Sequence, residues 1–136
     1  MSTNRDIALH AIDRWNAGDL DGYLELYHDD LKLHGYSDQP MSKEDATGFY
    51  KNIQASVGNS RIDIHQAFDD DTGHKVVLVY SLSGTHTGEM AGVPPTGNPI
   101  KQDGITVLRF RDGKVIERWS AADFAPVLMQ IGAIPS

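Results

Sequence analysis

The stretch Ser83 to Gly97, SGTHTGEMAGVPPTG, decides the fold expected for this chain. Its first residues end an apolar run typical of a β-strand, and its middle holds too many glycines and prolines to continue a strand. A second run of the same kind follows from Ile100 to Phe110. We therefore expect a long crossover between two strands.

Two amphipathic helices are expected at the start of the chain. From Asp6 to Trp15 the apolar residues recur at helical spacing, and Asn16-Ala17-Gly18 ends that helix. Asp19 is the expected N-cap of a second helix. The apolar face of this second helix is formed by Leu20, Tyr23, Leu24 and Tyr27. The short break between the helices predicts an angled pair.

The next segments alternate between strand and helix. Leu31 to His34 alternates apolar and polar residues, as a short half-buried strand does. Ser42 with Asp45 three residues later is typical of a capping box that opens a third helix, which Gly58 ends. Arg61 to Phe68 alternates again and predicts a strand.

The last third of the chain predicts two long strands, a hairpin and a short helix. Val76 to Tyr80 is an unbroken apolar run, which indicates burial on both faces of its strand. Asp112-Gly113 is a strong tight-turn signal, so the strands on either side of it are expected to be antiparallel neighbours. Asp123 is the expected N-cap of a closing helix that contains Pro126.

Composition limits the classes of function. The 136 residues suffice for one domain, residues 1–136, with a buried core. The net charge of −7 argues against nucleic acid and anionic membranes as partners, and neither a membrane span nor a signal peptide is visible, so a cytoplasmic protein is expected. Cysteine is absent, which excludes thiol chemistry, and the six histidines are scattered without metal-ligand spacing. We expect no metal and no other cofactor.

Grouped helices followed by grouped strands indicate an α+β fold, with helices packed into a strongly curved, mixed or antiparallel sheet. A bent sheet wrapped around helices leaves a cone-shaped hydrophobic cavity. Such a cavity is the default site for a small hydrophobic ligand.

The order GTHTG, Glu89, PPTG and then RFRDGKVIERW resembles the SnoaL-like polyketide cyclase family, and the likeness covers nearly the whole chain. That family belongs to the nuclear-transport-factor-like, or ketosteroid-isomerase-like, cone folds. The resemblance implies a homodimer through the sheet face. It also implies cofactor-free acid/base chemistry, such as an intramolecular aldol condensation on a polyketide ester.

The residues that the resemblance assigns to catalysis differ in this chain. The family's catalytic Asp falls at Ser120, directly after the Trp of ERW, and its assisting His falls at Thr106. A hydroxyl is no base at neutral pH without a partner, so Ser120 and Thr106 are expected to orient the substrate. The related isomerases are no better template, because their base aligns near Gly35 and their oxyanion Tyr near Ala11.

His34 and Asp123 are the candidate catalytic residues. Histidine titrates near neutral pH, and His34 lies close to the position of the isomerase base, where it could point into the mouth of the cone. Trp15 and His86 join Thr106 and Ser120 as candidate substrate-binding residues. Each has a structural alternative: a strand-end histidine at position 34, a loop-bonding histidine at 86, a helix cap at 123 and a core tryptophan at 15.

Three functions remain open. The first is an enzyme that performs cyclisation, isomerisation or hydration on a polyketide-like or steroid-like molecule. The second is a binding protein that keeps the cone without catalysis; an ionisable group of perturbed pKa in the pocket would favour the enzyme instead. The third is a protein-binding module that uses an apolar patch on the open sheet face.

Overall fold

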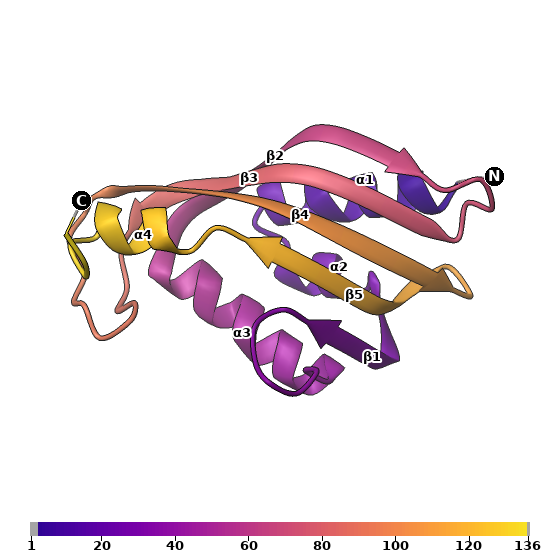
Figure 1. Cartoon of the computed structure of the whole chain (residues 1–136), viewed down its shortest axis with the longest axis horizontal. Helices are drawn as coiled ribbons and strands as arrows, with labels where there is room; N and C mark the ends of the chain where they lie inside the picture. Colours follow the sequence, from indigo (N-terminus) through magenta and orange to yellow (C-terminus); the bar gives the residue numbers. More distant parts are fainter. Residues whose placement is uncertain (1–2, 136) are drawn as a thin grey trace.

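The computed structural model describes residues 3–135, and Figure 1 shows α1 and α2 behind the strands, α3 beside them and α4 at one end of the sheet. In chain order the elements are α1 (Asn4–Asn16), α2 (Leu20–Leu24), β1 (Tyr27–His34), α3 (Lys43–Ser56), β2 (Val57–Asp69), β3 (Lys75–His86), β4 (Pro99–Arg111), β5 (Lys114–Ala122) and α4 (Ala125–Gln130). Within the described residues no helix is long and apolar enough to span a membrane.

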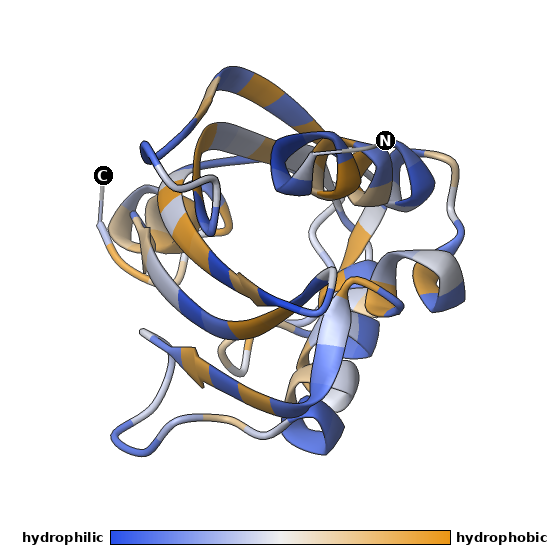
Figure 2. Ribbon diagram, turned by 90° about the vertical axis from the view of Figure 1, so that its right-hand side faces the viewer, coloured by the Kyte–Doolittle hydropathy of each residue, from blue (hydrophilic) through white to orange (hydrophobic). Residues whose placement is uncertain are grey.

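The strands form one sheet in the order β1-β5-β4-β3-β2. β1 runs parallel to β5, and the other neighbours are antiparallel. The sheet is unclosed and curves around the side on which α1, α2 and α3 lie (Figure 2). This arrangement confirms the expected α+β cone with a mixed sheet.

Local signals in the sequence start the helices as expected. Ser42 and Asp45 form a reciprocal capping box at α3, and Thr3 and Asp6 form another at α1. Asp19 accepts a hydrogen bond from the backbone N–H of Gly22, 2.9 Å away, and so caps α2. These caps satisfy backbone donors that have no partner within the helix.

The loop after β3 joins antiparallel neighbours. β3 and β4 pair along their whole length, so residues 87–98 form a long hairpin connection and the expected crossover is wrong. Gly88 lets this loop lie on the end of α3, because a Cβ at Gly88 would stand 2.5 Å from the carbonyl oxygen of Ala55. The tight turn at Asp112-Gly113, with both residues at positive φ, is confirmed.

Cross-strand rows define two faces of the sheet, because paired residues share a face. The inner face carries the rows Leu108–Arg118 and Leu78–Thr106–Ser120. The outer face carries the rows Val77–Val107–Trp119 and Val79–Ile105–Ala121. The buried core lies between the inner face and the helices, and it contains Ala8, Trp15, Tyr27, Leu33 and Val76 among others.

Three local expectations are corrected by the structure. Tyr27 starts β1 and does not continue α2, because the helix ends after Leu24. Asp123 is not an N-cap: Phe124 holds that position, and no side chain caps α4. Val77 and Val79 are only half-buried, so β3 is covered on its inner face alone.

Candidate active site

A cavity of about 820 Å³ lies between the inner face of the sheet and the helices. Its walls are mostly apolar and aromatic, with Trp15, Tyr36, Phe49, Tyr50, Ile53, Leu82 and Ile100 among the lining residues. Five of the lining residues are exposed and mark its mouth: Gly35, Asn52, Glu89, Ala91 and Phe124. The shape and lining suit a flat hydrophobic ligand.

Arg118 of β5 is the cation among the lining residues, and it is only 7% exposed. Strand alternation points its side chain inward, in the same direction as that of Ser120. Its Nε donates to Thr106 Oγ1 at 2.7 Å and to Ser120 Oγ at 2.9 Å. The hydroxyls of Thr106 and Ser120 are thus both acceptors for Arg118.

Three tyrosine hydroxyls accept hydrogen bonds from the Nη1 of Arg118. The distances are 3.2 Å to Tyr23, 2.5 Å to Tyr27 and 2.6 Å to Tyr50. Tyr27 also bonds Tyr23 at 2.6 Å and Tyr50 at 3.0 Å. Helix α2, strand β1 and helix α3 therefore meet at one guanidinium group.

The electrostatics of this cluster leave a net positive charge. Burial raises the pKa of both Tyr23 and Tyr50 well above the ordinary value, so both phenols are neutral at physiological pH. Burial opposes the charge of Arg118, but the surrounding tyrosines outweigh it and hold the pKa of Arg118 above its usual value. In the described part of the chain, no carboxylate lies within 4.0 Å of Arg118.

A fourth buried tyrosine, Tyr80, extends the polar end of the cavity. Tyr80 lies on the inner face opposite Gly104, and burial raises the pKa of Tyr80 to about 12. A Cβ at Gly104 would stand 2.7 Å from the Tyr80 ring, so the glycine is what allows the ring to lie across β4. Tyr80 therefore offers a neutral hydroxyl to the cavity region.

Of the residues expected to bind substrate, Trp15 lines the cavity. Its ring packs edge-on against Tyr23 and Tyr50, at centroid distances of 5.0 and 5.9 Å. Its Nε1 is fully enclosed and has no hydrogen-bond partner among the described residues. Thr106 and Ser120 do not line the cavity directly and lie behind Arg118, which they hold.

His86 is completely buried and lies outside the cavity lining. Its Nδ1 accepts the backbone N–H of Thr96 at 3.2 Å and is 2.8 Å from the Thr96 hydroxyl. Because Nδ1 is an acceptor, the ring proton is on Nε2. His86 thus fastens the PPTG segment to the end of β3, and a role in substrate binding stays a prediction.

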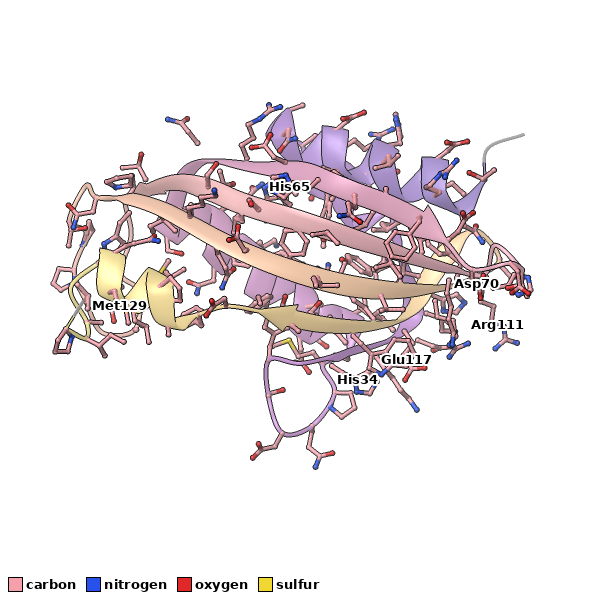
Figure 3. The ribbon with its side chains drawn as sticks, turned by 45° about the horizontal axis from the view of Figure 1, so that its top comes forward. His34, His65, Asp70, Arg111, Glu117 and Met129 are labelled. Carbon is pink, nitrogen blue, oxygen red and sulfur yellow. The ribbon has the colours of Figure 1, made fainter. Side chains whose placement is uncertain are left out.

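His34 lies on the outer face of the sheet, away from the cavity. It is paired with Trp119 across β1 and β5, and the two rings stack at 5.5 Å. Its Nε2 is 2.7 Å from Glu117 Oε2. Figure 3 shows the labelled side chains of His34 and Glu117 next to each other. Burial opposes the charge of Glu117, but hydrogen bonds from His34 and Arg109 together hold the pKa of Glu117 below its usual value. A catalytic role of His34 stays a prediction without support from its position.

Asp123 is exposed and also lies on the outer side of the sheet, where a hollow contains Asp123, His65, Ser81 and Asp103. Ser81 Oγ donates to Asp103 at 2.6 Å and is 2.7 Å from His65 Nε2. Asp103 therefore has the outward orientation that strand alternation predicts. The structure separates Asp123 from the cavity, and a catalytic role for it remains a prediction.

Sequence reasoning missed Arg118 and Glu89. Arg118 is two residues from Ser120, so the alternation that turns Ser120 inward turns Arg118 inward as well. The sequence Glu117-Arg118-Trp119-Ser120 contains this alternation. No comparable signal existed for Glu89, because its place at the mouth depends on how the loop 87–98 folds over α3.

Comparisons with known proteins agree with this fold. The sequence model of the family described as SnoaL-like polyketide cyclase matches residues 5–131. The chain is 22% identical over 134 residues to the aklanonic acid methyl ester cyclase of Streptomyces peucetius, covering 97% of this chain and 92% of that one. It is 25% identical over 129 residues to the nogalonic acid methyl ester cyclase of Streptomyces nogalater, covering 89% and 91%. The crystal structure of AclR from Streptomyces galilaeus is similar with a TM-score of 0.89 at 26% identity, covering 98% of this chain and 83% of that one.

Proposed function

Because the chain belongs to the SnoaL-like polyketide cyclase family, we propose that it performs cofactor-free acid/base chemistry on a hydrophobic, ring-forming small molecule bound in the cavity. One observation carries the proposal: the apolar cavity of about 820 Å³ contains a buried hydrogen-bond donor group at Arg118. Apolar walls bind the body of such a ligand, and convergent donors hold one of its oxygens.

An intramolecular aldol ring closure is the reaction that this arrangement serves best. A base removes a proton from a carbon next to a carbonyl group, the carbanion carbon bonds to a second carbonyl carbon, and the oxygen of that carbonyl takes up a proton. Atoms and electrons balance without an oxidant. Arg118 donates to the oxygen on which negative charge develops, which is the contribution of an oxyanion hole.

Glu89 is the proton acceptor that we propose. Among the described residues that line the cavity, Glu89 is the only one with a carboxylate. It lies exposed at the mouth. A carbon flanked by carbonyl groups loses its proton readily, so an exposed carboxylate is a sufficient base.

Replacement of Glu89 by glutamine should lower turnover by about 10²-fold or more, because the amide keeps the shape but cannot accept the proton. Ligand affinity and melting temperature should stay close to those of the wild type, since Glu89 is exposed. Asp71→Asn, in the turn between β2 and β3, is the matched control, and steady-state kinetics with a fluorescence binding assay is the measurement. Full turnover in E89Q would show that Glu89 is not the base. His34, Asp123 and water would then be the remaining candidates.

The proposed function is tested by a thermal-shift screen followed by turnover assays. The ligands are methyl esters of polycyclic aromatic polyketide acids, the type named for the two Streptomyces cyclases, together with steroids and simple polyaromatics. A cyclised product has the mass of its substrate and a different retention time. If none of these ligands stabilises the protein, the proposal is wrong.

The second candidate function is a binding protein without catalysis. It is favoured by one observation: the hydroxyls of Thr106 and Ser120, which the resemblance aligns with the family's acid/base pair, accept hydrogen bonds from Arg118 and are no bases at neutral pH. Ligand binding without any turnover would support this alternative.

We also propose that two copies pair through the outer face of the sheet, in the cytoplasm. Ile105 is 50% and Trp119 38% exposed, and the half-buried Val77, Val79 and Val107 complete the same apolar rows. Such an exposed apolar patch is typical of an interface.

The variant Ile105→Asp should convert a dimer into a monomer, because it places one carboxylate from each copy in the apolar contact. Light scattering after size exclusion measures the mass, with Asp71→Asn as the control. A wild-type chain that is monomeric at micromolar concentration would refute the pairing and favour a different protein as the partner of this face.

A further inference from the structure

We infer that the cavity selects a ligand that is already anionic: a flat, largely apolar molecule with one ionised oxygen, held by Nη2 of Arg118. A carboxylate, an acidic phenolate and an enolised 1,3-dicarbonyl share this chemistry. The inference rests on the proposed function, because both require a ligand in the cavity. It goes further in assigning the charge of that ligand in its ground state.

The first step is the charge balance. All five groups that accept from Arg118 are hydroxyls of Thr, Ser and Tyr, so none carries a compensating negative charge. Burying a cation without a counter-ion is costly, and an anion bound beside it recovers part of that cost. The cluster is therefore electrostatically complete only when a negative group is present.

The second step is the donor that remains. Nε and Nη1 of Arg118 make five hydrogen bonds, whereas Nη2 bonds no residue of the described chain. Nη2 is also absent from the fully enclosed atoms that lack a partner, so it keeps accessible surface. Since Arg118 lines the cavity, Nη2 is the donor that a ligand can reach.

The third step is the number of oxygens that can bind. A bidentate carboxylate needs two guanidinium nitrogens, and here one nitrogen is available. The two-nitrogen contact to a carboxylate is therefore not available, and Nη2 offers its N–H groups from one point. We expect an enolate or phenolate to bind through its one oxygen, and a carboxylate to bind Nη2 through one of its oxygens.

The fourth step is the shape of the ligand. Tyr36 and Phe49 lie against each other at a centroid distance of 4.6 Å, and Phe49 contacts Tyr50 at 5.4 Å. These three rings form one wall of the cavity, and Tyr50 also accepts from Arg118. An aromatic ligand packed on this wall brings an oxygen on its edge towards the guanidinium group.

Two probes test the inference. The first is anthracene-2-carboxylate, compared with its neutral methyl ester by calorimetry; we expect the carboxylate to bind at least about tenfold more tightly, as a charge-assisted hydrogen bond does. The second is 2-hydroxyanthraquinone, whose ionisation is followed by visible absorption. A neighbouring cation lowers the pKa of an acid, so the pKa of the bound phenol should fall by about one unit or more.

Variants assign the effect to one residue. Arg118→Met should abolish both effects, and Arg118→Lys should keep part of them. The control is Arg109→Met, which removes the same charge from the outer face, where Arg109 pairs with Glu117 at 2.9 Å. It should behave as the wild type. If a variant fails to fold, the inference is still tested on the wild-type protein. The test is then the affinity of the acid against that of the ester, and the pKa of the bound phenol.

The outcomes separate this inference from the proposed function. Tighter binding of the carboxylate alone supports the inference and identifies the ionised group as a carboxylate. A lowered pKa of the bound phenol alone supports it and identifies the group as a phenolate. Equal binding of acid and ester together with an unshifted phenol overturns the preference for an anion, while the bound ester leaves the proposed function intact. If neither these probes nor the polyketide esters bind, both proposals fail.

Discussion

Replacement of Arg118 by methionine should lower turnover by about 10²-fold or more while leaving the melting temperature nearly unchanged. The loss of turnover is expected because Nη2 is the proposed donor to the negatively charged oxygen of the substrate, and removal of one such donor has effects of this size. Methionine has a similar length and is apolar. The variant therefore removes the charge with little change in packing.

The effect on stability follows from the partners that the hydroxyls keep. Without Arg118, Tyr27 still bonds Tyr23 at 2.6 Å and Tyr50 at 3.0 Å. Thr106 still bonds the carbonyl of Trp119 and the hydroxyl of Ser120, both at 3.0 Å. No hydroxyl is orphaned, and the desolvation cost of the buried charge disappears together with the hydrogen bonds that offset it, so the net change in stability should be small.

Kinetics and a thermal melt on the same preparation measure both effects, with Arg109→Met as the control. A variant that retains turnover would remove Arg118 from the chemistry. A melting temperature lowered by more than about 5 °C would show instead that Arg118 supports the fold, as about 1 kcal/mol shifts the midpoint by a few degrees in a chain of this size.

The second large effect is expected at Gly35, which follows β1 and lines the cavity. Its φ is +115°, a region that residues with a side chain rarely adopt, and a Cβ there would stand 2.1 Å from the carbonyl oxygen of Ser120. Gly35→Ala should therefore destabilise the protein by roughly 3 kcal/mol or more, from backbone strain and overpacking together.

Denaturant unfolding measures this loss, and Gly18→Ala is its matched control. Gly18 has a φ of +77° but no atom within 4 Å of a Cβ, so it reports backbone strain alone, about 1 kcal/mol. Equal losses at the two positions would contradict the close contact between Gly35 and Ser120.

Local signals predicted much of the fold. The capping box of Ser42 and Asp45, the cap at Asp19 and the turn at Asp112-Gly113 each depend on neighbouring residues, and the structure confirms all three. The family read from GTHTG and PPTG is confirmed by the match over residues 5–131. These features needed no knowledge of distant contacts.

Features that depend on distant contacts were predicted less well. Tyr27 fits a helical face by spacing, but its hydroxyl is required beside Arg118, which is 91 residues away in the chain. The apolar run Val76 to Tyr80 predicted two buried faces, whereas one face is open unless a second copy covers it. His34 looked like a cavity residue because periodicity cannot tell which face of a strand is the inner one.

In β5, neighbouring residues face opposite sides of the sheet, so substitutions at adjacent positions affect either the cavity side or the outer surface. The side chains at positions 118 and 120 face the inner side of the sheet, and those at positions 117 and 119 face the outer surface. A lineage can thus change its ligand by point substitutions without altering how copies meet. An insertion or deletion of one residue within β5 would exchange both sets at once. Length differences among relatives should therefore accumulate in residues 35–41 and 87–98, outside this strand.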